Sequence, residues 1–526
     1  MKNFLSLVLV FTFAAAFSAC SSSVPKPDGI PTALVTGGQV EGTVADGLSI
    51  FKGIPFAAPP VGELRWKSPQ PVAPWTDVKK TVDFGNSCMQ DMNMARSMGD
   101  ASEISEDCLY LNVWSPAARA SDRLPVLVWI YGGGFTGGMT SVPMYNGEHL
   151  AKKGVVVVST AYRVGPFGFL AHSELSAESG NGSGNYGLED MIAGLKWVKN
   201  NVDKFGGDPS KVTIFGHSAG GMAVSMLAAS PEAAGLFRGV IAMSGASMAP
   251  LRTSTRGGVG ARVTTLSLAE TEGATFIGKL GASNIAAARG ISAEEIQKSI
   301  AGSGVSFRPV ADSHIILDDQ YLMYQAGRFN DTPILLGSTS DESASMGARR
   351  TTAAEFVKQV NSNYGSDAAG ILAAYPHAND DEASLSSKQL SRDNTFGWNA
   401  WTWARMQTQN GKGKAFIYYF NHHAPTSPDG AGHGSDVPYA FQTLAGRDGA
   451  QPDDADAALS DVISSYWVNF TKTGDPNADG LPAWPAYSDA SPKAMIFNNG
   501  AGAAEDYPNM EKLQAMDKYL ARLRAQ

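Results

Sequence analysis

Short, mainly apolar runs alternate along this chain with longer segments in which apolar residues recur at helical spacing. Runs rich in valine, isoleucine and aromatic residues are typical of strands that are buried on both faces of a parallel sheet. Helical spacing marks residues 189–200 and the segment from Ala219 to Ser230, where Pro231 ends the helix. The pattern therefore predicts an α/β fold with a mostly parallel sheet. The strand-like runs are residues 126–131, 154–160, 238–243, 332–336 and 415–420.

A further strand-like run, residues 211–215, leads directly into the segment GHSAG and then into a helix. A serine on a sharp turn between strand and helix needs small neighbours two residues before and after it, and Gly216 and Gly220 meet that need. The turn exposes the hydroxyl of Ser218 and aims the N–H of Ala219 at a developing oxyanion. A chance match in a glycine-rich chain is the alternative, but the flanking elements favour Ser218 as a nucleophile.

A nucleophilic serine also needs a base, an acid that orients the base, and N–H donors for the oxyanion. The apolar run at residues 126–131 breaks into Gly132, Gly133 and Gly134. Unhindered N–H groups in such a segment can approach a substrate oxygen closely. A flexible loop is the alternative interpretation of the three glycines.

The orienting acid is expected after the strand-like run at residues 332–336, where Asp341 and Glu342 follow in a loop. We choose Glu342, although residue types alone do not separate two adjacent carboxylates. For both residues, an exposed loop charge is the alternative.

The histidine that acts as base is chosen by its position along the chain relative to the serine and the acid. Hydrolases with this turn have the order serine, acid, histidine, which leaves His377, His422, His423 and His433. His433 lies in a glycine-flanked loop after the run at residues 415–420, which suits a side chain that passes a proton between nucleophile and leaving group. His422 and His423, at the end of that run, are expected to be structural.

Several further segments, spread from about Val35 to the C-terminus, make the chain resemble the type B carboxylesterases, which include the cholinesterases. Together these segments are specific to that family. They are FKGIPFA at residues 51–57, PPVGELR at 59–65, SEDCLYLNVW at 105–114, YRVGPFGFL at 162–170, FGGDP at 205–209 and NFTKTGDP at 469–476.

The resemblance implies an α/β-hydrolase fold, in which a large and mostly parallel sheet is flanked by helices, with inserted helices and loops over the active site. It implies a triad of Ser218, Glu342 and His433 and an oxyanion hole from the N–H groups of Gly133, Gly134 and Ala219. Two departures are visible in the sequence. Ser343 replaces the glycine that usually follows the acid, and His217 replaces the glutamate that usually precedes the nucleophile. We expect His217 to point away from Ser218.

The same resemblance implies structural pairs that take no part in catalysis. It implies ion pairs of Arg65 with Glu106 and of Arg163 with Asp190. It also implies a buried Ser244 that donates a hydrogen bond near the acid, and a disulfide between Cys88 and Cys108. A disulfide requires an oxidising compartment.

Composition and charge limit the kinds of partner that this protein is expected to bind. The formal net charge is −9 and no basic run is present, so nucleic acid is not expected as a partner. There is no phosphate-binding glycine loop followed by lysine and no cysteine–histidine cluster, so no cofactor and no metal are expected. The expected partner is a small-molecule ester. Arg349 and Arg350 offer charge to an anionic substrate, but a solvated surface is the expected role for both.

The N-terminus resembles a bacterial lipoprotein signal. A basic start and an apolar stretch lead to FSAC at residues 17–20, followed by three serines. We expect a signal peptide over residues 1–19, a lipidated Cys20, a tether over residues 20–34, and one catalytic domain over residues 35–526. An ordinary secretory signal cut near Ala16 or Ala19 is the alternative. Both place the enzyme outside the cytoplasm, in the cell envelope or beyond it.

The sequence predicts a serine carboxylesterase and leaves two rival functions. One is a non-catalytic binding protein with an esterase-like fold, which the intact triad opposes. The other is a different acyl hydrolase, such as an amidase, peptidase or lipase. Cholinesterase activity is disfavoured, because residues 89–107 contain no aromatic platform for a quaternary ammonium group.

Overall fold

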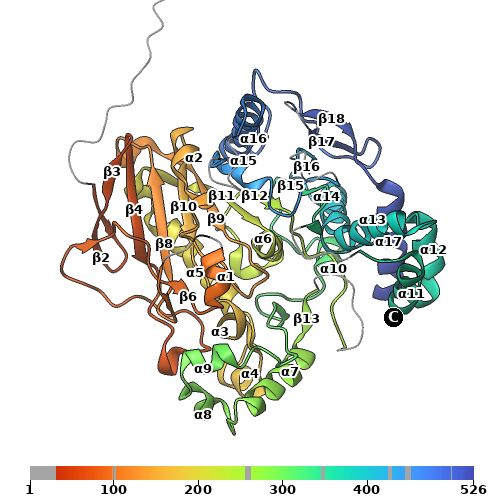
Figure 1. Ribbon diagram of the computed structural model, residues 1–526. Helices are drawn as coiled ribbons and strands as arrows, with labels where there is room; N and C mark the ends of the chain where they lie inside the picture. Colours follow the sequence, from red (N-terminus) through yellow and green to blue (C-terminus); the bar gives the residue numbers. More distant parts are fainter. Residues whose placement is uncertain are drawn as a thin grey trace, which may run out of the picture.

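A twisted sheet runs through the middle of the molecule in the computed structural model (Figure 1). The structure describes residues 31–97, 99, 102–254, 262–344, 350–423, 429–444, 452–498, 500 and 502–525. The proposed signal peptide, Cys20 and most of the tether therefore lie outside the described residues. Within the described part, the largest sheet has 11 strands, in the order β18-β17-β16-β15-β12-β11-β9-β10-β8-β4-β3.

The strands from β17 to β10 in that order are parallel to one another, and the strands beyond them at both edges are antiparallel. The parallel strands are the apolar runs of the sequence, and most of their side chains are fully buried. The bounds are β3 (Thr43–Ala45), β4 (Leu48–Pro55), β8 (Tyr110–Ser115), β9 (Leu124–Ile130), β10 (Val156–Thr160), β11 (Gly207–His217), β12 (Gly239–Met243), β15 (Ile334–Thr339), β16 (Ala415–Phe420), β17 (Lys493–Phe497) and β18 (Ala503–Asp506).

Helices pack against this sheet and complete the α/β-hydrolase fold that the sequence predicted. The main ones are α5 (Tyr186–Asn201), α6 (Ala219–Ala229), α14 (Trp398–Asn410) and α16 (Asp454–Thr473). Shorter ones are α1 (Met92–Ser97), α2 (Glu148–Lys152), α3 (Gly165–Phe169), α4 (Ser173–Ser179), α10 (Gln320–Gln325) and α15 (Val437–Phe441). Every residue of α6 is buried, so this helix lies in the core rather than at the surface.

Further helices gather beside the sheet in two groups. One group, α7 (Leu266–Lys279), α8 (Ile285–Arg289) and α9 (Ala293–Lys298), lies with α4 at the bottom of the view (Figure 1). The other comprises α11 (Ala353–Tyr364), α12 (Ala368–Ala374), α13 (Asp380–Arg392) and α17 (Met510–Arg524). Small sheets pair β1 (Thr32–Val35) with β2 (Gly38–Glu41) and β5 (Lys79–Lys80), β6 (Ser87–Cys88) with β7 (Ile104–Ser105), and β13 (Thr264–Thr265) with β14 (Val310–Ala311). Among the described helices, none has the length and hydropathy that crossing a bilayer requires.

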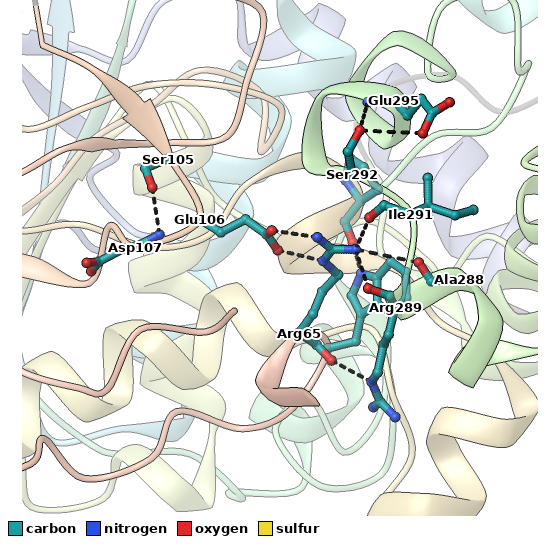
Figure 2. Close-up of polar contacts among 11 residues, drawn as sticks. Arg65, Ser105, Glu106, Asp107, Ala288, Arg289, Ile291, Ser292 and Glu295 are labelled. Atoms are coloured by element: carbon teal, nitrogen blue, oxygen red, sulfur yellow. Dashed lines mark hydrogen bonds and ion pairs between the residues drawn. The ribbon is translucent and has the colours of Figure 1, made fainter. Parts of the chain in front are cut away.

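The Arg65 side chain ties the inserted helices to the N-terminal part of the chain (Figure 2). Its Nε and Nη2 atoms donate to the two carboxylate oxygens of Glu106, both at 2.6 Å. Its Nη1 atom donates to the carbonyls of Arg289 and Ile291 at the end of α8, at 3.1 and 2.7 Å. One guanidinium therefore joins a predicted ion pair to the C-terminus of a helix that is distant in sequence.

The second predicted ion pair lies deeper in the molecule. Arg163 Nε and Nη2 each donate to Asp190 at 2.8 Å, and the two side chains are 3% and 0% exposed. Both predicted ion pairs are confirmed. The predicted disulfide between Cys88 and Cys108 is also confirmed.

Candidate active site

Ser218 lies on the turn between β11 and α6, and its backbone is strained. Its φ of 57° and ψ of −122° fall outside the regions that residues with a side chain favour. A Cβ at Gly216 would meet the backbone carbon of Gly220 at 2.5 Å, and a Cβ at Gly220 would meet the Ile130 carbonyl oxygen at 2.1 Å. The turn therefore excludes side chains at positions 216 and 220, as the G-x-S-x-G pattern predicted.

Three side chains form one continuous line of hydrogen bonds. His433 Nε2 lies 2.8 Å from Ser218 Oγ, and His433 Nδ1 lies 2.5 Å from Glu342 Oε2. The Glu342 side chain is fully buried, and its other oxygen accepts a hydrogen bond from the N–H of Thr339 at 2.8 Å. An imidazole protonated on Nδ1 can therefore donate to the carboxylate and accept the serine proton on Nε2.

The sheet brings Glu342 and His433 together, because β15 and β16 are parallel neighbours whose carboxyl ends meet at one edge. The N–H of Asp341 donates to the Ala431 carbonyl at 2.8 Å, which aligns the two loops. The Asp341 carboxylate lies 3.5 Å from Lys388 Nζ, whereas Glu342 meets His433. The geometry thus separates the two adjacent carboxylates that residue types alone did not.

A glycine loop after β9 presents free backbone donors beside the serine. Gly133 has φ of 113° and Gly134 has φ of 65°. The carbonyl of Gly133 accepts from the N–H groups of Thr136 and Gly137, at 3.0 and 3.2 Å, which fixes the orientation of the loop. The N–H groups of Gly133, Gly134 and Ala219 have no hydrogen-bond acceptor among the described residues. Such donors are suited to an oxyanion.

The family model for the carboxylesterase family matches residues 29–516. This chain belongs to the carboxylesterase family. It is 35% identical over 492 residues to a fumonisin B1 esterase of Sphingopyxis macrogoltabida, covering 89% of this chain and 86% of the relative. It is 33% identical over 503 residues to a para-nitrobenzyl esterase of Bacillus subtilis (strain 168), covering 91% and 97%.

Solved structures agree with these sequence relatives. A PNB esterase structure superposes with a TM-score of 0.81 at 33% identity, over 92% of this chain and 99% of that chain. The protein is therefore a serine hydrolase of carboxylic esters with an α/β-hydrolase fold, as predicted. Among the described residues, no group of histidine, cysteine and acidic side chains is arranged to hold a metal ion.

The anchoring of the glycine loop of this esterase was not predicted from the sequence. The Gln90 side chain belongs to a residue that is 3% exposed and lies shortly after Cys88, which forms the disulfide with Cys108. Its Nε2 atom donates to the carbonyls of Cys88 and Gly138, and its Oε1 atom accepts from the N–H of Gly138 at 2.9 Å. The amide thus links the disulfide to the far end of the loop that carries Gly133.

The surroundings of His433 were also not predicted from the sequence. Two rings pack against the ring of His433. The centroid-to-centroid distance is 4.5 Å for His217 and 4.8 Å for Phe396. His217 was expected only to point away from Ser218, and its contact with the base went unrecognised. Asp436 is buried nearby and accepts a hydrogen bond from Tyr418 at 2.6 Å, and burial raises the pKa of Asp436 to about 6.

Two expectations about supporting residues have different outcomes. His422 Nε2 lies 2.6 Å from the Asp456 carboxylate, so its structural role is confirmed. The expected role of Ser244 is wrong, because its buried Oγ has no hydrogen-bond partner in the described part of the chain. Instead, the backbone N–H of Ser244 donates to the Gly337 carbonyl of β15 at 2.9 Å. The backbone of Ser244 therefore contacts the strand that leads to Glu342.

Proposed function

We propose that this carboxylesterase cleaves its substrate with Ser218 as nucleophile, His433 as general base and acid, and Glu342 as the group that orients His433. The observation that supports this proposal is the unbroken line of hydrogen bonds from the buried Glu342 carboxylate through the imidazole to Ser218 Oγ. Nucleophile and base lie within the reach that proton transfer requires.

The reaction takes place in two halves. Ser218 Oγ attacks the ester carbonyl carbon while His433 Nε2 accepts its proton, and the resulting oxyanion binds the N–H groups of Gly133, Gly134 and Ala219. The tetrahedral intermediate then releases the alcohol, which takes the proton from His433. Water attacks the acyl-enzyme in the same way, and the carboxylic acid leaves as the Ser218 proton is restored.

Substitution of Ser218 tests the proposal directly. The Ser218→Ala variant should lose turnover by about 10⁶, because members of a triad act as a unit. It should also fail to react with a fluorophosphonate probe that labels the wild type. Retention of more than about a tenth of wild-type turnover would contradict the assignment, because a triad without its nucleophile keeps only a minute fraction of its rate.

A matched pair of histidine variants tests the base. The His433→Ala variant should be inactive, whereas His423→Ala should keep its activity. The opposite result would move the base to the end of β16. Paired ester and amide substrates then separate this function from an amidase, because an amide needs stronger protonation of its leaving group.

We further propose that the enzyme is exported and anchored through Cys20. The disulfide supports export, because disulfides form and persist in oxidising compartments. Intact-mass analysis of envelope material should find a mature chain that begins at an acylated Cys20. The Cys20→Ser variant should be released from the membrane with its esterase activity unchanged. A chain that still begins at Met1 would contradict export, and a start without acyl mass would contradict the lipid anchor.

A further inference from the structure

A narrow cavity lies beside the nucleophile and has a cationic wall. Its lining includes Phe135, which directly follows the oxyanion loop, and Met222, whose N–H donates to the Ser218 carbonyl at 2.8 Å. Arg308 and Arg262 also line it. Met222 lies one helical turn beyond Ser218, so the cavity begins about 6 Å along α6 from the nucleophile.

The guanidinium groups around this cavity outnumber their counter-charges. Arg252 forms a bidentate pair with Glu272, at 2.8 and 2.6 Å. Arg308 donates through Nε to the Ser306 hydroxyl at 3.1 Å, and its two Nη groups have no hydrogen-bond or ion-pair partner among the described residues. Among the described residues, the hydrogen-bond acceptors of Arg262 are the backbone carbonyls of residues 250 and 251. Asp319 and Arg524 also act on Arg262, and they pair with each other at 2.8 Å. The cluster therefore holds four cations and two carboxylates, and Arg308 has no carboxylate partner among the described residues.

This imbalance is unfavourable in the protein without a ligand. Burial lowers the pKa of Arg308, and the nearby charge of Arg252 lowers it further. A partly buried cation without a counter-charge loses hydration and gains little in return. The chain as a whole is acidic, with a net charge of −9, so the cluster does not reflect a basic composition. An anion in the cavity would offset both effects.

We propose that Arg308, supported by Arg262, binds a carboxylate on the acyl part of the substrate. The inference rests on the proposed function, because the site is defined by its place beside Ser218. A guanidinium with free Nη groups matches the two oxygens of a carboxylate. The cavity has room for about one water molecule, so it admits only the charged end of a substrate and not the chain that carries it.

The position of the cavity selects the acyl part over the alcohol. The leaving alcohol must lie within reach of His433 Nε2, which donates its proton. The rings that contact His433 are His217 and Phe396, and neither lines the cavity. The cavity instead adjoins Phe135, at the end of the oxyanion loop. The charged end of an acyl chain that extends from the carbonyl carbon past this loop enters the cavity.

Kinetics with matched esters test the site. Monoethyl succinate carries a carboxylate on its acyl chain, and ethyl 4-methylpentanoate is its neutral counterpart of similar shape. The wild type should prefer the anionic ester in kcat/KM by about tenfold or more. The Arg308→Met variant should lower the ratio of anionic to neutral kcat/KM by about 10- to 100-fold, the range for hydrogen bonds to charged groups. The Arg308→Lys variant should restore part of it.

Arg350→Met is the matched control. Arg350 is exposed and pairs with Asp381, away from the cavity, and this substitution should not change the ratio. Arg349 lies outside the described residues. A second pair, 3-acetoxypropanoate and 3-methylbutyl acetate, carries the charge on the alcohol and should show no dependence on Arg308.

The proposal is overturned if the wild type shows no preference between the first pair and Arg308→Met leaves their ratio unchanged. It is also overturned if the charge is preferred on the alcohol. Failure of the proposed function would give a different result. In that case the neutral esters would also not be hydrolysed, and the fluorophosphonate probe would not label Ser218. Thermal unfolding of the Arg308 variants checks that they are folded.

Discussion

The amide of Gln90 gives the sharpest test of how the oxyanion loop is held. We consider Gln90→Met, which keeps the volume and shape of the side chain but removes both polar ends. Three hydrogen bonds disappear: two that the Gln90 amide donates, to the carbonyls of Cys88 and Gly138, and one that it accepts from the Gly138 N–H. Because the site is 3% exposed, water does not replace them freely.

The magnitude follows from the groups left without partners. A buried polar group that loses its partner destabilises the protein by about 1–3 kcal/mol. The N–H and the carbonyl of Gly138 both lose a partner, so the free energy of unfolding should fall by about 2–6 kcal/mol. A Cβ at Gly138 would lie 2.3 Å from the Gly132 carbonyl oxygen, so this end of the loop packs directly against the start of the glycine run. Movement at Gly138 therefore displaces the N–H donors of Gly133 and Gly134.

The functional loss should appear in kcat rather than KM, because oxyanion donors act on the transition state. Loss of one such donor lowers kcat by about 10²–10³, and a displaced loop should lower it by at least about tenfold. Urea unfolding and steady-state hydrolysis of a 4-nitrophenyl ester measure the two effects in one preparation. If stability falls as expected while kcat is unchanged, Gln90 is only a structural residue. If neither changes, the hydrogen-bond reasoning is refuted.

Three further predictions concern stability. Asp190→Asn should lower the free energy of unfolding, measured in urea, by about 3–5 kcal/mol, because it leaves the buried charge of Arg163 without a counter-charge. A loss below about 1 kcal/mol, which is the range for exposed ion pairs, would contradict this expectation. The double variant Cys88→Ala, Cys108→Ala should lose about 3 kcal/mol for a crosslink with a sequence separation of 20, and an unchanged urea midpoint would refute it. The native state holds the Asp436 proton up to a pKa of about 6, so its contribution to stability falls by about 3 kcal/mol as pH rises from about 4 to 6. Asp436→Asn lacks this dependence, and its stability relative to wild type should rise over that interval; a constant difference would contradict the assignment.

Local sequence patterns predicted the buried strands and the serine turn, because residues close together in the sequence determine both. Apolar runs marked β9, β10, β12, β15 and β16 because strands buried on both faces need no polar positions. The serine turn was visible because its glycines are sterically required within five residues. The ion pairs and the disulfide were predicted only through the resemblance to a family, because their partners are far apart in sequence and carry no local signal.

The missed residues share one property, which is that tertiary contacts alone give them their roles. Gln90 meets Gly138 across 48 positions, and nothing near Gln90 marks it as special. Arg308 was passed over in favour of Arg349 and Arg350, which are adjacent and conspicuous. The hydrogen bond predicted for the Ser244 side chain was not found, for a different reason. Its backbone rather than its side chain makes the contact with β15, and residue type does not reveal which of the two a buried serine uses.

The backbone of Ser218 gives the nucleophile a thermodynamic disadvantage that selection for stability alone would remove. A residue held at φ of 57° and ψ of −122° is about 1–3 kcal/mol less favourable there than in an ordinary conformation. Glycine adopts positive φ without this penalty. In a laboratory screen for heat resistance that ignored turnover, Ser218→Gly should therefore be enriched while esterase activity disappeared. A thermostable engineered form of this enzyme needs an activity selection at the same time, because this strained residue is also the nucleophile that we propose.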